Sequence, residues 1–243
     1  MAEHHWTTFA TEPVKRLVEL LPSQDINSYR ETMMSLGGCL ATTIATSLEN
    51  ENNRGKPIYI ACSVEDADFL AKGLLTSLEK TFSEIRFACF WNKSTIEPDG
   101  VEDFEFSPIL KQYKEMAANQ ECILIVVKSI ISGACVVATN INNLMTELNP
   151  ISIYIAAPVM LDNADKKLKS QFPTKYQSRF SFISFAIDNQ KDQNGMILPG
   201  IGGSVYERYG FASEADKNIY LPTIVKTRRK TYAQTLNSDC KIN

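Results

Sequence analysis

The chain has 243 residues, 44% hydrophobic and 22% charged, which is the composition of an ordinary globular protein with a buried core. Its net charge of -3 favours neither nucleic acid nor an anionic membrane as a partner of the whole chain. No apolar run reaches the roughly 18 residues of a membrane span, and the start Met1-Ala2-Glu3-His4-His5 is too polar for a secretion signal, so a cytoplasmic protein without membrane contact is expected.

The predicted elements alternate between helices and short apolar strands. A helix is predicted over 12–21 and a longer one over 27–48, which Asn27 or Ser28 can cap. Strands are predicted at 57–62, 85–91, 122–127, 151–156 and 180–187. Further helices are predicted at 65–80, after the third strand as far as about residue 147, and at 164–172. Fully apolar strands that alternate with helices indicate an α/β fold with a parallel sheet covered on both faces. Ligands of such folds bind beyond the carboxyl ends of the strands.

Two segments that follow predicted strands have the residues of a ligand loop. After the third strand comes Lys128-Ser129-Ile130-Ile131-Ser132-Gly133-Ala134-Cys135, in which hydroxyl and glycine residues open a helix and can cradle a phosphate. After the fifth strand comes Met196-Ile197-Leu198-Pro199-Gly200-Ile201-Gly202-Gly203, whose glycines let backbone amides approach a flat ligand closely. Taken alone, each segment is also compatible with an ordinary turn.

Five segments in chain order resemble the uracil phosphoribosyltransferase family, over about residues 10–211. They are Ser23-Gln24-Asp25-Ile26 with Gly37-Gly38-Cys39-Leu40, then Asn92-Lys93-Ser94-Thr95-Ile96-Glu97-Pro98, the segment 127–135, Ala156-Ala157-Pro158, and the loop 196–203. The resemblance implies a type I phosphoribosyltransferase fold, with a parallel core sheet, a small hood and a dimeric assembly. It also implies that Met196, Ile197, Leu198, Gly202 and Gly203 bind the base, and that Val127 to Cys135 hold phosphoribosyl pyrophosphate (PRPP) with magnesium.

The chain departs from the family's pattern at the positions that perform its chemistry. The ribose-binding acid corresponds to Val127, or to Lys128 with a one-residue gap, and neither side chain accepts hydrogen bonds from ribose hydroxyls. The pyrophosphate-loop arginine corresponds to Glu65, which with Asp66 repels a pyrophosphate. Gly203 stands where the family has an acid that organises substrate and metal. We therefore expect a catalytically silent, dimeric binding, regulatory or assembly component, with nucleobase or nucleotide binding kept from the ancestral site.

Two alternatives remain open. One is an active, diverged transferase that uses uracil or a related base. The other is a nucleic-acid-associated protein that uses a basic C-terminal extension, residues 212–243, in which six Lys or Arg against three acids give a charge of +3. This extension is expected to pack on the domain 1–211 or on a partner. The acidic loop over 97–105 is interpreted as a solvated segment or a docking surface for a basic partner.

Cysteine and histidine usage predicts neither disulfides nor a metal site. The six cysteines are scattered without a CxxC pair, which indicates buried thiols in a reducing compartment. The two histidines are adjacent, at a start of the chain that has the composition of a disordered terminus. Cys135 near a helix start is consequently given no nucleophilic role.

Overall fold

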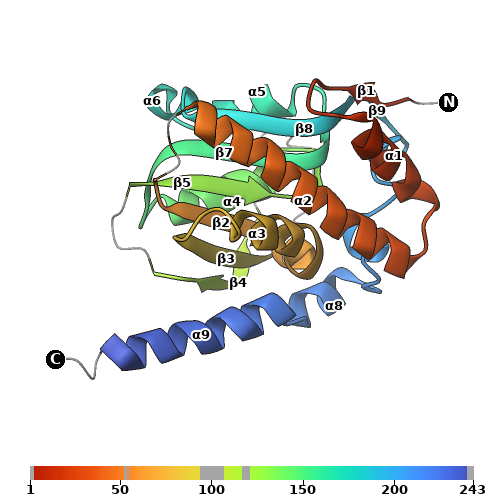
Figure 1. Cartoon of the computed structure of the whole chain (residues 1–243). Coiled ribbons are helices and arrows are strands. Elements are labelled where there is room, and N and C mark those ends of the chain that lie inside the picture. The colour runs from red at the N-terminus through yellow and green to blue at the C-terminus, as the bar shows by residue number, and fades with distance from the viewer. Residues whose placement is uncertain (1–2, 52, 54, 94–106, 117–120, 240–243) are drawn as a thin grey trace.

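The computed structural model describes residues 3–51, 53, 55–93, 107–116 and 121–239, with side chains as far as residue 231 (Figure 1). One mixed sheet forms the centre, with strand order β1-β8-β7-β5-β2-β3-β4 and with β6 paired to β7. Its strands are β1 (His5–Trp6), β2 (Ile58–Ser63), β3 (Ile85–Asn92), β4 (Ile109–Lys114), β5 (Glu121–Val127), β6 (Ile130–Ile131), β7 (Asn149–Leu161) and β8 (Phe180–Asp188). All the pairs from β8 across to β3 are parallel, and the two edge strands β1 and β4 are antiparallel. The predicted α/β class is confirmed.

Helices cover both faces of this sheet, and a small hairpin stands apart from it. The helices are α1 (Glu12–Leu20), α2 (Ile26–Asn50), α3 (Lys72–Leu78), α4 (Cys135–Leu144), α5 (Ala164–Ser170), α6 (Thr174–Gln177), α7 (Val205–Arg208), α8 (Glu214–Ile219) and α9 (Thr223–Asp239). The hairpin joins β9 (Gln190–Lys191) to β10 (Ile197–Leu198). In the part of the chain that the structure describes, no helix is both long and apolar enough to cross a bilayer.

Alternate strand residues feed two separate cores. Ile60 and Ile125 face the core beneath α2 and α3, whereas Ala61, Leu124 and Val126 face the second core, under α4 and α5. Because side chains alternate across a strand, a central strand buried on both faces must be apolar at every position. This requirement explains why the sequence pattern located β2, β3, β5, β7 and β8. It could not show which residues of each strand face which of the two cores.

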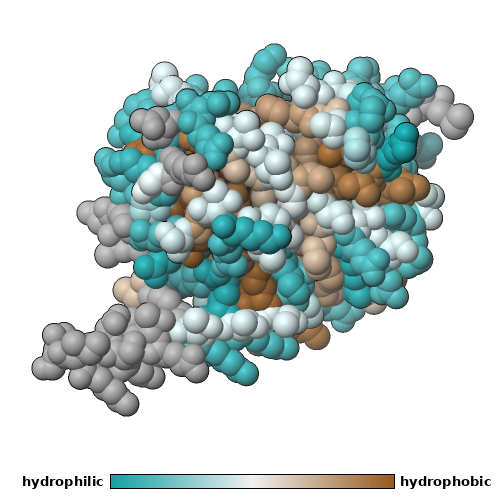
Figure 2. Space-filling view, in the orientation of Figure 1, coloured by the Kyte–Doolittle hydropathy of each residue, from teal (hydrophilic) through white to brown (hydrophobic). Residues whose placement is uncertain are grey.

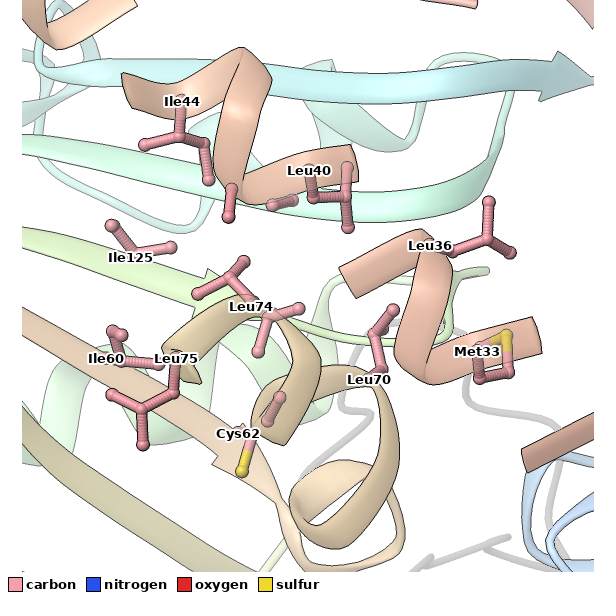
Figure 3. Close-up of a cluster of buried hydrophobic side chains, with 14 of the residues drawn as sticks. Met33, Leu36, Leu40, Ile44, Ile60, Cys62, Leu70, Leu74, Leu75 and Ile125 are labelled. Atoms are coloured by element: carbon pink, nitrogen blue, oxygen red, sulfur yellow. The ribbon is translucent and has the colours of Figure 1, made fainter. Parts of the chain in front are cut away.

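Two glycines fix the crossing of α2 over α3. A Cβ atom added at Gly37 would lie 2.1 Å from the Leu70 carbonyl oxygen, and one added at Gly73 would lie 2.0 Å from the Met34 carbonyl oxygen. The helix backbones therefore touch, and flanking side chains such as Leu40 and Leu74 close the core around the contact (Figure 3). Gly37, the first glycine of the Gly37-Gly38 pair, thus has a packing role.

Several local predictions were wrong, for identifiable reasons. Asp25 caps α2, because its carboxylate accepts hydrogen bonds from the backbone of Asn27 and Ser28. The helix predicted over 65–80 begins instead as a 3-10 turn (64–66) and a π turn (67–71), and only then continues as α3. The side chains of residues 65 and 66 are bound to the residues that follow β5. β4 was not predicted, and the acidic loop 97–105 lies outside the described residues.

The C-terminal segment is fastened to the body of the protein at the start of α9. The Asp68 carboxylate accepts hydrogen bonds from the backbone of Thr223 and Ile224, at 2.6 and 2.8 Å, and so caps this helix. Ile224 and Val225 are buried. Figure 1 shows α9 running past β4, so that its C-terminal end projects beyond the sheet. On the face of the molecule drawn in Figure 2, apolar surface gathers over α1 and the start of α2, and Leu20 of α1 is exposed.

Candidate functional site

The strand order has one point where it reverses, between β2 and β5. In chain order the parallel strands are β2, β3, β5, β7 and β8, so the connection from β2 leads to one side and the connection from β5 to the other. Such a switch point opens a crevice at the carboxyl ends of the strands, where ligands of α/β proteins bind. Glu65 and Asp66 follow β2, and Lys128 and Ser129 follow β5. The structure thus brings the expected pyrophosphate-loop residues, Glu65 and Asp66, next to the start of the predicted phosphate loop.

These four residues are bound in two pairs, and Glu65, Asp66 and Ser129 are buried while Lys128 is half-buried. Lys128 Nζ donates to Glu65 Oε1 at 3.2 Å. The backbone N–H of Ser129 donates to Asp66 Oδ1 at 3.2 Å, and the Ser129 hydroxyl makes a short hydrogen bond to the same oxygen. Asp66 and Ser129 are fully buried. The crevice is therefore filled by contacts within the chain.

Tyr209 and Lys217, from later in the chain, add two side chains to this group. We call the whole set the strand-end cluster, and it consists of Glu65, Asp66, Lys128, Ser129, Tyr209 and Lys217. The hydroxyl of Tyr209, itself fully buried, lies 2.8 Å from Ser129 Oγ and 3.3 Å from Asp66 Oδ1. Lys217 Nζ donates to the Asn92 carbonyl oxygen at 3.2 Å and lies 4.0 Å from Glu65 Oε2. Only 6% of Lys217 is exposed. A buried ammonium thus stands at the strand ends, supplied by the chain itself.

The two acids of the cluster have different electrostatic surroundings. Burial opposes ionisation of Glu65, but Lys128 and then Lys217 outweigh it, so the pKa of Glu65 is lowered. Burial raises the pKa of Asp66 to about 6, and the nearby Glu65 charge adds to this effect, although Lys128 and the hydrogen bonds from Ser129 act in the opposite direction. Burial also opposes the charge of Lys128, but Glu65 and Asp66 more than compensate and raise its pKa. Glu65 is therefore the ionised partner of the two lysines.

The rest of the predicted phosphate loop leads into α4. Ile130 and Ile131 form β6 and are buried, so they pack rather than face a ligand. Ser132 and Gly133 precede Ala134, the N-cap residue of α4, and Ala134 makes no side-chain capping bond. Cys135 is the first residue of α4 and is half-buried. In the described part of the chain, no group of three or more His, Cys, Asp or Glu residues could hold a metal ion.

The predicted base loop is held by the carboxylates of Asp188 and Asp192 and packs against Pro22. The backbone N–H of Gly200 donates to Asp188 Oδ2 at 2.9 Å, and that of Met196 donates to Asp192 Oδ1 at 2.8 Å. Gly202 has a φ of +79°, and a Cβ atom there would lie 2.3 Å from Pro22 Cα. Ile197 is buried, and Leu198 is 38% exposed. The loop backbone thus makes its described hydrogen bonds within this part of the protein, and these bonds do not reach the strand-end cluster.

The start of the chain is ordered, contrary to the prediction. His5 and Trp6 pair with β8, and His4 Nδ1 lies 2.9 and 3.0 Å from the two carboxylate oxygens of Asp188. This His4–Asp188 pair escaped the sequence reasoning because its members are 184 positions apart. The aromatic Trp6 beside a polar start was the only local signal of burial.

The basic C-terminal run does not act as one free patch. Arg228 binds the Glu115 carboxylate through Nε at 2.7 Å and Nη2 at 2.8 Å, and it binds Glu79 through Nη1 at 2.7 Å. Its neighbours Arg229 and Lys230 are exposed. A cleft of about 650 Å³ lies beside this ion pair, between α3 and the first turns of α9. Because Arg228 is bound to these acids, it does not contribute a free charge to the predicted nucleic-acid surface.

Comparisons with known proteins support the fold. No protein-family model and no curated protein matches the chain. The AQ2163 protein from Aquifex aeolicus has a similar structure, with a TM-score of 0.63 and 14% identity over 87% of this chain and 98% of that one. The hypoxanthine-guanine phosphoribosyltransferase of L. donovani aligns with a TM-score of 0.39 and 17% identity, over 66% of this chain and 83% of that one. A hypoxanthine phosphoribosyltransferase from Trypanosoma cruzi aligns with a TM-score of 0.43 and 14% identity, over 66% and 74%. These last two scores are too low to carry an argument, so the first similarity establishes a shared α/β fold and nothing finer.

Proposed function

We propose that the chain is a phosphoribosyltransferase-like protein without transferase activity, which works as a binding or assembly component. One observation carries this proposal: the buried Lys217 ammonium, with Tyr209, occupies the strand ends where a ligand of such a fold binds. The five sequence segments that resemble the uracil phosphoribosyltransferase family support the same ancestry. The β9–β10 hairpin corresponds in this proposal to the hood.

The residues at the strand ends do not fit magnesium and PRPP. Such a site needs cations for the phosphates and an exposed acid for the ribose hydroxyls. Here Lys128 is bound to Glu65, and Asp66 is fully buried against Ser129 and Tyr209. Admitting PRPP would require these buried contacts to break together. We therefore derive no reaction step through PRPP for this chain.

Titration calorimetry with magnesium–PRPP, together with chromatographic detection of UMP from uracil and PRPP, tests the proposal. We expect neither heat of PRPP binding nor UMP. Micromolar binding of PRPP, or UMP formed in proportion to enzyme, would overturn the proposal in favour of an active transferase. Titrations with uracil and UMP then ask whether a nucleobase or nucleotide site was kept, and sedimentation equilibrium tests the homodimer. The exposed apolar surface over α1 and α2 supports a contact between two copies of the chain.

One observation favours a second candidate function, in nucleic-acid association. Lys226, Arg229 and Lys230 are exposed at the spacing i, i+3, i+4, which places them on one face of α9. Phosphate contacts from such a row would make binding depend steeply on salt. The triple alanine variant of these residues should abolish that binding, whereas Arg228 must be left intact because it holds the helix to the body. Absent binding, or binding unchanged by the substitutions, eliminates this candidate.

A further inference from the structure

Two free cysteines lie side by side on neighbouring strands of the central sheet. The parallel pairing of β2 with β3 places Cys62 directly opposite Cys89. Their side chains leave the sheet on the same face and enter the core beneath α2 and α3. Neighbouring strands are about 4.8 Å apart, which lies within the range of about 4.4–6.8 Å between the Cα atoms of disulfide-bonded cysteines. A disulfide between these two residues therefore fits the existing strand register.

The two thiols contact each other and are shielded from solvent. Cys62 is 1% exposed and Cys89 is fully buried. Burial raises the pKa of the Cys62 thiol well above its ordinary value, and a hydrogen bond with Cys89 raises it further. Figure 3 shows Cys62 among the apolar side chains of this core. An oxidant that reaches the pair in the folded protein must therefore be small and uncharged.

We propose that Cys62 and Cys89 are a modification site, which a hydroperoxide converts into a reversible disulfide. One thiol, as its thiolate, attacks an oxygen of hydrogen peroxide, which gives a sulfenic acid and one molecule of water. The neighbouring sulfur then attacks the sulfenic sulfur, and the S–S bond forms as a second molecule of water leaves. The two thiols lose two electrons in total, and the peroxide takes them up. A dithiol reverses the step by thiol–disulfide exchange.

The bond would join the two strands that present the partners of Lys217. Glu65 follows β2, and the carbonyl of Asn92, the last residue of β3, accepts the hydrogen bond from Lys217 Nζ. Oxidation would therefore hold both partners of the buried ammonium on one covalently linked pair of strands. Neither cysteine belongs to the strand-end cluster, so the inference does not depend on whether the chain has lost transferase activity.

Peptide mapping of the peroxide-treated, full-length protein tests the proposal. Trypsin separates the two cysteines, because Lys72, Lys80 and Arg86 lie between them. We expect a peptide pair linked through Cys62 and Cys89, which dithiothreitol releases. Because the bond closes the loop between the strands, the oxidised protein should melt about 5–10 °C higher than the reduced one.

Two variants and a second oxidant sharpen this test. Cys122→Ala is the matched control, since Cys122 is a buried thiol of the other core and is paired in register with Pro150, and this variant should form the link unchanged. Cys89→Ala should lose the link and carry sulfinic acid at Cys62, because no neighbouring thiol captures the sulfenic acid. Glutathione disulfide is charged and bulky, so it should leave the pair reduced in the folded protein.

Three results would overturn the proposal. The first is oxidation of the half-buried Cys39 and Cys135 by peroxide while Cys62 and Cys89 stay reduced. The second is a link that appears only at denaturing urea concentrations, which would place the reaction in the unfolded chain. The third is formation of the link as fast with glutathione disulfide as with peroxide, which would show that the core opens before it reacts.

Discussion

Replacing Lys217 by methionine tests whether a buried charge holds the C-terminal segment at the strand ends. Methionine keeps most of the length of the side chain and removes the ammonium. In the wild type, Nζ lies 4.0 Å from Glu65 Oε2 and 3.8 Å from Glu214 Oε1, and it donates to the Asn92 carbonyl at 3.2 Å. The substitution therefore removes one buried ion pair, one half-exposed ion pair and one hydrogen bond.

The expected loss of unfolding free energy is about 3 kcal/mol. Two unit charges 4 Å apart attract by about 4 kcal/mol at an effective dielectric constant of 20. The side chain of Glu214 is 31% exposed, so its pair adds at most about 1 kcal/mol. Dehydration of the ammonium offsets part of this attraction, and removal of one partner of a buried pair costs about 3–5 kcal/mol in practice. The lower end applies because Lys128 still faces Glu65.

Urea denaturation at several pH values measures the effect. Lys217 helps to lower the pKa of Glu65 below its ordinary value of 4.5. A lowered carboxylate pKa contributes stability above the unfolded pKa, and this stability is lost as pH falls through the folded pKa. The deficit of Lys217→Met should therefore be largest at pH 7 and shrink in acid. Lys226→Met, an exposed lysine of α9, is the control. A loss below about 1 kcal/mol, or an equal loss in the control, would refute the reasoning.

Three further predictions concern buried contacts elsewhere in the described chain. Asp66→Asn should flatten the pH dependence of stability, because a folded pKa of about 6 against an ordinary value of 3.8 makes wild type lose up to about 3 kcal/mol as pH rises from 4 to 6. Urea midpoints that fall equally in both proteins would contradict this. Gly37→Ala should lower the melting temperature through a loss of about 2 kcal/mol, since its Cβ would overlap the backbone of α3, whereas Gly38→Ala next to it should be neutral or stabilising; equal effects would disprove the packing argument. Arg228→Met should cost about 3 kcal/mol in urea unfolding and Arg229→Met less than about 0.5, because only Arg228 is bound to buried acid; similar losses would show that α9 is not held by this ion pair.

The central sheet could be predicted because its signal is local. Each of the strands β2, β3, β5, β7 and β8 is an apolar run flanked by polar turns, and burial on both faces imposes that composition on any central parallel strand. The loops after β2 and β5 could also be placed at one edge, because parallel strands end on the same side. β1 escaped prediction because it is two residues long and gains its pairing from β8.

The candidate site could be predicted only in part. The sequence singled out residues 65, 66 and 128, and the structure places them together at the strand ends. Some of their partners lie far along the chain, and no periodicity links residue 217 to residue 65 or residue 4 to residue 188. Arg228 counts toward the positive charge of the predicted extension but is an ion-pair partner, because a sequence gives its charge and not the acid that faces it.

By itself, the sequence determined the alternation of strands and helices and the types of residue that follow each strand, since both are properties of residue type at a position. Only the tertiary structure decided what fills the resulting crevice. A buried carboxylate must find a partner wherever the chain can supply one, and here the fold brings Lys217 back from the C-terminal segment and His4 back from the start of the chain.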